Sequence, residues 1–320
     1  MQVLIADDSP VSRRLLNVKV AQWGYEPVVV EDGRQAWETL TRIAAPRIAI
    51  LDWRMPGMDG TEICEKLRSR IDGPYTYVIL MTSCNLASSA VDGLRAGADD
   101  FVRKPFDPDE LEQRLRTGRR ITELQDRLLA AQAELRIQAT HDSLTGMWNR
   151  GAILQMLERE WDRMQRQNAP MGVLMIDLDN FKRINDEHGH QAGDDALRTV
   201  SRLMTQAVRS YDQVGRYGGE EFLVVAPNAT LKNAVAIAER IRFRVDCHPV
   251  SIGDLALPLT VSIGVASSAE FVDGGKDLAH RADQALYAAK RSGRNRVCTF
   301  QQAMQLQRSA PSLAESQRQN

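Results

Sequence analysis

The chain has 320 residues, of which 43% are hydrophobic and 26% are charged, and its formal net charge is −1. At about 150 residues per domain, this length suggests two domains of ordinary globular composition. The lack of a basic excess argues against a role in binding nucleic acid. No stretch approaches the ~18 consecutive apolar residues of a membrane span, and the first apolar run, Val3–Ala6, is too short for a signal peptide. We therefore expect a cytoplasmic protein that binds neither nucleic acid nor membrane.

The four cysteines are scattered along the chain and include no Cys-x-x-Cys pair. They are Cys64, Cys84, Cys247 and Cys298. This usage fits a reducing compartment and predicts neither a disulfide scaffold nor a cysteine-based zinc site. His188 and His190 are close in the sequence, but no third soft ligand lies near them there, so a zinc site is disfavoured at this position as well.

Strand and helix signals alternate over the first hundred residues. Ser9 and Pro10 mark the start of a helix that Gly24 ends, and a second helix over about residues 34–44 ends before Pro46. Strands are predicted at five apolar runs, over residues 3–6, 26–30, 47–51, 75–81 and 100–103. The alternation favours an α/β fold with a doubly wound, five-stranded parallel sheet.

Five polar residues stand at or after the ends of these strands, namely Asp7, Asp8, Asp52, Thr82 and Lys104. Because ligands of parallel sheets bind beyond the carboxyl ends of the strands, these side chains should converge on one crevice. Clustered carboxylates repel each other unless a hard cation such as Mg²⁺ lies between them, and a metal-screened carboxylate can attack a phosphoryl group. Each residue alone is more often a solvated loop residue. The five together predict a phosphoacceptor site whose hydroxyl and ammonium groups bind phosphate oxygens.

With these residues and their spacing, residues 1–106 resemble the receiver domains of bacterial response regulators. The resemblance implies that Asp52 accepts a phosphoryl group from a cognate histidine kinase, which the sequence does not name. It also implies a Mg²⁺ site formed by Asp8, Asp52 and the backbone carbonyl of Arg54, with Asp7 assisting.

The same resemblance gives Thr82 and Phe101 the role of a conformational switch pair. It places the ammonium group of Lys104 on the phosphate. It further implies a cis peptide bond between Lys104 and Pro105, a state that is rare except before proline.

A helical pattern without internal proline covers residues 107–140 after the starting Asp107-Pro108. Apolar residues at a and d spacing predict a short coiled coil, and hence a homodimer formed through the receiver and this linker. The seam consists of Ile121, Leu124, Leu128, Ala131, Leu135 and Gln138.

An earlier seam through Leu111, Leu115, Gly118 and Thr122 is out of phase with the coiled coil, because the step from Leu115 to Ile121 is six residues instead of seven. A glycine within a helix costs about 1 kcal/mol relative to alanine. Two interpretations of Gly118 stay open: it is a hinge between competing helix registers, or it marks the end of the receiver's last helix.

Residues 141–300 predict a separate α+β domain with a central antiparallel sheet. Helices are predicted over about residues 150–168, 194–208, 231–245 and 276–291, and strands over 171–177, 214–217, 220–226 and 259–266. Gly218 and Gly219 are a turn signal between two of these strands. Residues 301–320 are polar and rich in Gln and Ser, so we expect a disordered tail.

Acidic residues mark two strands of this second domain. Asp177 ends one strand, and Glu220 and Glu221 begin the return strand of the hairpin. If the strands are neighbours, the carboxylates meet at one edge, where they could hold Mg²⁺ against nucleotide phosphates. Gly218 and Gly219 would let a ligand approach the backbone, although a Gly-Gly pair alone is more often an ordinary turn.

The surrounding motifs closely resemble those of the GGDEF family of diguanylate cyclases, with the signature written GGEEF here. The motifs that carry the resemblance are residues 142–150, 177–186, 189–194, 216–222 and 283–295. The resemblance implies a nucleotidyltransferase that condenses two GTP molecules into cyclic di-GMP and two pyrophosphates. Because each domain holds one GTP, the active site would form between two chains of a homodimer.

Site residues follow from this resemblance. Asp177 and Glu220, helped by the Leu178 carbonyl, would bind two Mg²⁺ ions, for which Mn²⁺ could substitute. Glu221 would be either a metal ligand or the general base, and the sequence does not decide between them. Guanine would be read by Asn185 and Asp194, and the triphosphate neutralised by Lys182, Lys290 and Arg294.

An arginine–aspartate pair precedes the hairpin, formed by Arg209 and Asp212. Such a pair is more often a plain surface salt bridge that contributes little stability. In the GGDEF family an RxxD motif at this spacing is the inhibitory product site, and Arg240 matches the secondary arginine that completes it. The resemblance therefore implies feedback inhibition by cyclic di-GMP.

Two other functions would suit parts of this pattern. One is a catalytically silent receptor for GTP or cyclic di-GMP built on the same domain. The other is a phosphorelay adaptor whose second half only dimerises. Both are disfavoured, since the complete set of signature acids and guanine-reading residues is present.

Overall fold

The computed structural model describes residues 1–70, 73–83, 95–252, 255–269 and 274–309. The chain forms two compact units, Met1–Glu134 and Leu135–Asn320, which are described separately below. Cys84 and residues 310–320 of the expected tail lie outside the described residues. Within the described part of the chain, no helix has both the length and the apolar character needed to cross a bilayer.

The first unit contains a five-stranded parallel sheet, as expected from the sequence. Its strands are β1 (Gln2–Ala6), β2 (Glu26–Val30), β3 (Ile48–Asp52), β4 (Tyr77–Thr82) and β5 (Asp100–Arg103). The strand order is β2-β1-β3-β4-β5. Strand β4 begins two residues later than predicted, because the Tyr75 carbonyl accepts a hydrogen bond from the Arg47 side chain (2.7 Å) instead of joining the ladder.

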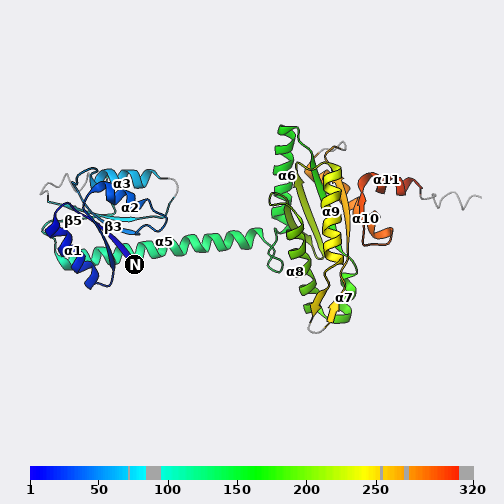
Figure 1. Ribbon diagram of the computed structural model, residues 1–320, viewed down its shortest axis with the longest axis horizontal. Coiled ribbons are helices and arrows are strands. Elements are labelled where there is room, and N and C mark those ends of the chain that lie inside the picture. The colour runs from blue at the N-terminus through cyan, green and yellow to red at the C-terminus, as the bar shows by residue number, and fades with distance from the viewer. Residues whose placement is uncertain (71–72, 84–94, 253–254, 270–273, 310–320) are drawn as a thin grey trace, which may run out of the picture. The chain divides into compact units, whose positions relative to one another are not determined.

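Helices cover both faces of this sheet (Figure 1). One face packs against α1 (Pro10–Gln22) and α5 (Pro108–Thr140), and the other against α2 (Gly33–Leu40) and α3 (Gly60–Ser69). The predicted extension of α2 to residue 44 is wrong. The Thr41 hydroxyl donates to the carbonyls of Trp37 and Glu38, and this local bonding favours the helix end.

The first half of α5 is part of the core of this unit. Leu111, Leu115, Gly118 and Thr122 are buried there, so the expected start of a separate linker at residue 107 does not match the packing. Gly118 lies within a continuous helix and does not end it. Its role is close packing, because a Cβ atom at this position would lie 2.6 Å from Cδ1 of Tyr77.

The second unit contains a sheet of five strands in the order β12-β11-β6-β8-β7. The strands are β6 (Met171–Leu178), β7 (Gln213–Gly218), β8 (Glu221–Pro227), β11 (Val261–Ser267) and β12 (Val297–Thr299). All neighbours are antiparallel except β11 and β12, which run parallel. The central antiparallel sheet is therefore confirmed, with one parallel edge strand that the sequence pattern did not indicate.

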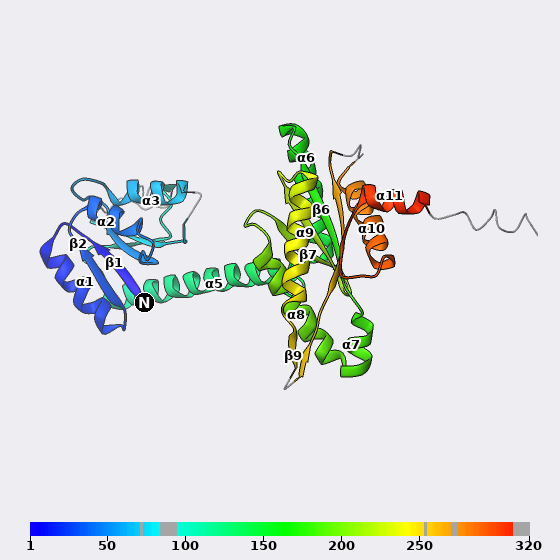
Figure 2. The same ribbon diagram turned by 45° about the vertical axis from the view of Figure 1, so that its right-hand side comes forward.

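Helices again cover both faces (Figures 1 and 2). The pair α6 (Arg150–Gln167) and α10 (Gly275–Arg291) packs on one face, and the pair α8 (His190–Ala207) and α9 (Leu231–Asp246) packs on the other. Two short strands, β9 (Val250–Ile252) and β10 (Leu255–Leu257), form a separate antiparallel pair.

Two helices of the second unit were not expected. Helix α7 (Phe181–His188) forms where the sequence pattern predicted no helix or strand, and Gly189, with φ of +82°, separates it from α8. Helix α11 (Phe300–Ser309) occupies residues expected to be a disordered tail. Its first turn is fixed by a hydrogen bond from the Gln302 amide to the Thr299 hydroxyl (3.2 Å) and by the burial of Ala303.

We predict that Gly118→Ala destabilises the first unit. The new methyl group would overlap the ring of Tyr77, which is buried and bonds Asp100 through its hydroxyl (3.2 Å). Overpacking costs about 1–3 kcal/mol, which exceeds the ~1 kcal/mol that alanine contributes through helix propensity. Denaturant unfolding should therefore show a lower free energy of unfolding.

The matched control is Gly151→Ala in α6. The nearest atom to a Cβ there is Oδ1 of Asn149 at 3.5 Å, an ordinary contact, so the second unit should lose no stability. Unchanged stability in the Gly118 variant would contradict the packing role.

Candidate functional site

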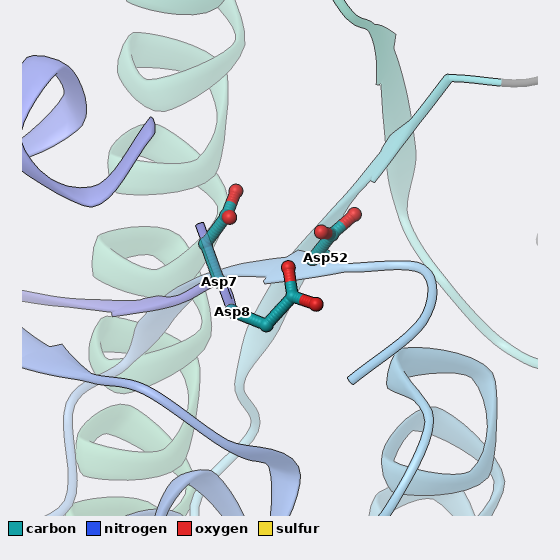
Figure 3. Close-up of side chains that lie close together, drawn as sticks. All are labelled: Asp7, Asp8 and Asp52. Atoms are coloured by element: carbon teal, nitrogen blue, oxygen red, sulfur yellow. The ribbon is translucent and has the colours of Figure 1, made fainter. Parts of the chain in front are cut away.

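Three carboxylates meet at the carboxyl ends of β1 and β3, as Figure 3 shows. One carboxylate oxygen from each of Asp7, Asp8 and Asp52 lies within 4.8 Å of the others. Asp7 is buried, and Asp8 is exposed. Oxygen donors on two strand ends are the ligand type that Mg²⁺ prefers, so the donor set fits this ion.

A single lysine holds this cluster together. Nζ of Lys104 lies 2.7 Å from Oδ2 of both Asp7 and Asp52. Burial raises the pKa of Asp52, and the hydrogen bond and charge of Lys104 offset only part of this effect. Burial would lower the pKa of Lys104, but its hydrogen bonds to the two carboxylates outweigh burial and raise it.

The remaining residues predicted for this site lie around the same edge. Thr82 is buried at the end of β4, and its carbonyl accepts a hydrogen bond from the Lys104 amide (2.8 Å). Phe101 is half-buried on the neighbouring strand β5, and Arg54 follows β3 in an exposed turn. The expected cis bond between Lys104 and Pro105 is present.

The second site lies where β6 and β8 run side by side. Asp177 and Glu221 are cross-strand partners, and the Leu178 amide donates to the carbonyl of Glu220 (3.2 Å). The adjacent cavity has a volume of about 420 Å³ and is lined by Asp177, Glu220, Lys182, Lys290 and Arg294, among others. The antiparallel pairing of β6 and β8 thus brings the predicted acids to one edge of the sheet, as expected if the hairpin strand is a neighbour of the Asp177 strand.

Burial and mutual repulsion disfavour ionisation of these carboxyls. Burial raises the pKa of Asp177, which the hydrogen bond from Lys290 (2.7 Å) partly offsets. Burial also raises the pKa of Glu220 and of Glu221, and the charge of Asp177 adds to both shifts. A divalent cation would relieve this repulsion, so these oxygen donors also fit Mg²⁺.

The two predicted guanine-reading residues lie outside this cavity. Asn185 is on α7 and Asp194 is on α8, and both are partly exposed. These helices pack closely, because a Cβ at Gly193 would lie only 2.0 Å from Oδ1 of Asn185. Glycine at this position therefore allows the Asn185 side chain to lie beside the start of α8.

Two further carboxylates, Asp142 and Asp179, lie within the signature motifs but were given no role by the sequence analysis. Asp179 is buried and accepts hydrogen bonds from the hydroxyls of Thr260 (2.8 Å) and Ser262 (2.6 Å) and from the amide of Asn295 (3.0 Å). It joins the end of β6 to β11 and to the loop after α10. No local pattern indicates this role, because the hydrogen bonds join Asp179 to residues 81 to 116 positions away in the sequence.

The other overlooked carboxylate is Asp142, which forms a salt bridge with Arg216 (3.1 Å). Arg216 also donates to the Gly219 carbonyl through Nε (2.9 Å) and Nη2 (2.7 Å). Burial would raise the pKa of Asp142, but hydrogen bonds from Thr145 and the charge of Arg216 outweigh it and lower the pKa. This pair fixes the turn of the GGEEF signature.

The predicted regulatory residues line a different cavity of about 340 Å³ that includes Arg209 and Asp212. One oxygen of Asp212 accepts from the Arg209 amide (2.9 Å), while the other is buried without a hydrogen-bond partner among the described residues. Burial raises the pKa of Asp212. The Arg209 guanidinium donates to the Tyr211 hydroxyl (2.9 Å). Arg240 donates to the Ala207 carbonyl and does not line the cavity.

Comparison with known families matches both halves of the chain. Residues 3–116 match the response regulator receiver domain, and residues 139–296 match the diguanylate cyclase, GGDEF domain. The chain belongs to the response regulators that join these two domains. The first unit is the receiver domain, and the second is the GGDEF domain.

Among known proteins, the chain is 35% identical over 303 residues to the response regulator PleD of Caulobacter vibrioides, which covers 92% of this chain and 65% of PleD. It is 34% identical over 242 residues to diguanylate cyclase DgcP of Pseudomonas aeruginosa, covering 73% of this chain and 36% of DgcP. The chain thus spans less than two thirds of either relative.

Among solved structures, the coiled coil and GGDEF domain of DgcB from Caulobacter crescentus, in complex with c-di-GMP, is 32% identical with a TM-score of 0.53. The match covers 59% of this chain and 98% of that one. This likeness agrees with a linker helix followed by a GGDEF domain.

We predict that Mg²⁺ binding to the GGDEF domain is strongly pH-dependent. The raised pKa values of Asp177, Glu220 and Glu221 mean that protons compete with the ion at a pH above the ordinary carboxyl values of 3.8 and 4.5. Calorimetric titration of an Asp52→Asn variant, which simplifies the receiver site, should show an affinity that begins to fall at a pH above these ordinary values and then falls by up to about tenfold per pH unit for each proton displaced.

Glu187→Gln, which removes an exposed acid of α7, is the control and should leave this profile unchanged. An affinity that begins to fall only below the ordinary carboxyl values of 3.8 and 4.5 would contradict the prediction.

Proposed function

We propose that this protein is a diguanylate cyclase whose activity is controlled by phosphorylation of its receiver domain. It would convert two GTP molecules into cyclic di-GMP and two pyrophosphates. The observation that carries the proposal is the cavity where Asp177 and Glu220 lie with Lys290 and Arg294. This combination of acids and cations suits a metal-bound triphosphate.

The chain's own side chains would hold the substrate in an ordered way. Lys182, Lys290 and Arg294 neutralise the triphosphate from α7 and from the end of α10 and the loop after it. Asn185 and Asp194 read the guanine edge, since a carboxylate accepts from N1–H and the exocyclic amine, a donor pattern that adenine lacks.

The donor set fits Mg²⁺ in the cyclase domain. Asp177 and Glu220, with the Leu178 carbonyl, would hold two ions, and Mn²⁺ could replace them. When bound, the ions supply positive charge that stabilises the α-phosphate and the leaving pyrophosphate.

The reaction consumes two GTP molecules and needs no other reactant. A 3′-oxygen of one GTP bonds to the α-phosphorus of the other as the bond to the bridging oxygen breaks and pyrophosphate leaves. The proton of the 3′-hydroxyl passes to a carboxylate, for which Glu221 is the candidate. A second, symmetric step closes the ring.

A homodimer follows from this chemistry, because one cavity holds one nucleotide. The second half of α5 supports a dimer, since its apolar side chains are exposed: Leu124 by 55%, Leu128 by 53% and Leu135 by 63%. Apolar residues at a and d spacing are buried when two helices form a coiled coil.

Receiver control would begin at Asp52. A histidine kinase would donate a phosphoryl group to this carboxylate beside Mg²⁺ held by Asp7, Asp8, Asp52 and the Arg54 carbonyl. Lys104 and Thr82 would then bind the phosphate, with Phe101 as the second switch residue. Helix α5, which packs on the same sheet, would carry the change to the coiled coil.

The decisive experiment is chromatography of the products formed from GTP and Mg²⁺, with and without beryllofluoride as a phosphoryl mimic on Asp52. We expect cyclic di-GMP, formed faster with the mimic and with rates per chain that rise with protein concentration. Glu220→Ala should lower turnover by at least about 100-fold, since it removes a charge that acts at the reacting phosphate.

The outcomes separate the rival functions. No cyclic di-GMP under either condition would favour a silent nucleotide receptor. If cyclic di-GMP forms equally fast with and without the mimic, the receiver does not control the cyclase. If a strictly monomeric preparation has the same turnover per chain as a concentrated one, the active site does not require a dimer.

Feedback inhibition through Arg209 and Asp212 is the second part of the proposal. The buried, unpartnered oxygen of Asp212 supports a ligand-binding role for this cavity, because such an atom gains a hydrogen bond when a guanine binds. Arg240 would complete the site only after leaving the Ala207 carbonyl.

We therefore predict that Arg209→Ala raises the cyclic di-GMP concentration needed for half-inhibition by at least about tenfold, the effect of losing one charge-assisted contact. Initial rates without product should stay within about twofold, which is too small to reflect lost transition-state binding. Product-inhibition curves measure both, with Arg202→Ala on exposed α8 surface as the control. Unaltered inhibition would exclude the RxxD site from regulation.

A further inference from the structure

A buried carboxylate follows the predicted metal ligand Asp177 by two residues. Asp179 stands just after β6 and is only 5% exposed. Its Oδ2 accepts hydrogen bonds from the Thr260 hydroxyl (2.8 Å) and the Asn295 amide (3.0 Å), and its Oδ1 accepts one from the Ser262 hydroxyl (2.6 Å). Burying a charge is costly unless its oxygens are hydrogen-bonded, and these three donors meet that need. One of them belongs to the loop after α10.

This loop has an unusual backbone. Arg294 and Asn295 have φ angles of +59° and +45°, so two consecutive residues other than glycine are in the left-handed region. Residues with a Cβ atom rarely adopt this conformation, and it persists only where surrounding contacts impose it. The Asn295 amide donates to Asp179, and the Asn295 side-chain oxygen accepts from Arg242 of α9 (3.1 Å). These two contacts, from different elements, therefore stabilise the observed shape of the loop.

The Arg294 side chain depends on the loop for its position. It lines the cavity of about 420 Å³ that Asp177 also lines. Within the part of the chain that the structure describes, its guanidinium makes no hydrogen bond or salt bridge. Lys290, by contrast, is fixed by its ion pair with Asp177 (2.7 Å). Because no such side-chain contact anchors Arg294, the backbone of residues 294 and 295 sets the direction from which it reaches a ligand.

We propose that Asp179 is a positioning residue for the triphosphate of GTP. By accepting from the Asn295 amide, it stabilises the left-handed turn and keeps the Arg294 guanidinium directed into the cavity. Since Asp179 also follows Asp177 at the end of β6, one buried group fixes the phosphate-binding arginine relative to the predicted metal ligand. The inference rests on the proposed function in one respect, that the cavity binds GTP.

A purely structural role for Asp179 is the alternative, because its bonds to Thr260 and Ser262 connect the end of β6 to β11 and the residue before it. Loss of the carboxylate would then lower stability without acting through Arg294. A double-mutant cycle separates the two roles, since a residue that acts through another has no further effect once the other is removed.

The test measures the affinity of the full-length protein for 3′-deoxy-GTP with Mg²⁺ by calorimetry. This nucleotide lacks the attacking hydroxyl, so binding is measured without turnover. We expect Asp179→Ala and Arg294→Ala each to bind it at least about tenfold more weakly, and the double variant to stay within about twofold of Arg294→Ala. Asp179→Asn keeps an acceptor for the Asn295 amide and should stay within about threefold of the wild type.

Asp277→Ala is the matched control. This carboxylate lies in the first turn of α10, at the opposite end of the helix from the loop, and pairs with Arg281 (3.0 Å). Its loss should leave the affinity for 3′-deoxy-GTP unchanged. Thermal unfolding followed by circular dichroism verifies that each variant is folded. If Asp179→Ala does not fold, Asp179→Ser replaces it in the cycle, because serine keeps a polar group there but is too short to bond the Asn295 amide.

Three results would overturn the inference: wild-type affinity in Asp179→Ala, additive losses in the double variant, or an Asp179→Asn variant as weak as Asp179→Ala. Product analysis of the wild type with GTP tests the proposed function separately. Binding of 3′-deoxy-GTP without synthesis of cyclic di-GMP would refute the cyclase function, while the affinities of the variants would still decide the inference. A wild type that does not bind 3′-deoxy-GTP would refute both.

Discussion

In both domains, carboxylates are held close together against their mutual repulsion by one lysine. Lys104 bridges Asp7 and Asp52 in the receiver, and Lys290 pairs with Asp177 in the GGDEF domain. Without such a counter-charge, partly buried carboxylates would protonate or move apart. The functions proposed for both domains depend on this arrangement. When a metal ion binds the carboxylates, it replaces the lysine as their counter-charge, and the lysine ammonium group can then bind a phosphate.

The convergence of the receiver's acids and lysine could be predicted from the sequence because the geometry of a parallel sheet is restrictive. Residues that follow successive strands must lie at the same edge, so Asp7, Asp52 and Lys104 could be placed together from strand positions alone. The GGDEF acids needed one further assumption, that the hairpin pairs with β6, and the register of Asp177 with Glu221 satisfies it.

Other features depended on contacts that no local pattern reveals. Gly118 looked like a hinge or a helix end, yet it packs against Tyr77, which lies 41 positions earlier in the chain and on another element. Helix α11 was not predicted because its residues are mostly polar and only Ala303 among those described is buried. Helix α7 was not predicted because it is short and a single glycine, Gly189, separates it from α8.

Strand β4 has a consequence for how a signal could leave the receiver. Thr82 stands at one end of this strand, and Tyr77 at the other end touches α5 at Gly118, where there is no room for even a methyl group. Closely packed interiors transmit displacement because they contain little free space to absorb it. A displacement at the edge where Asp52 and Thr82 lie would therefore reach α5 through β4 with little free space to absorb it.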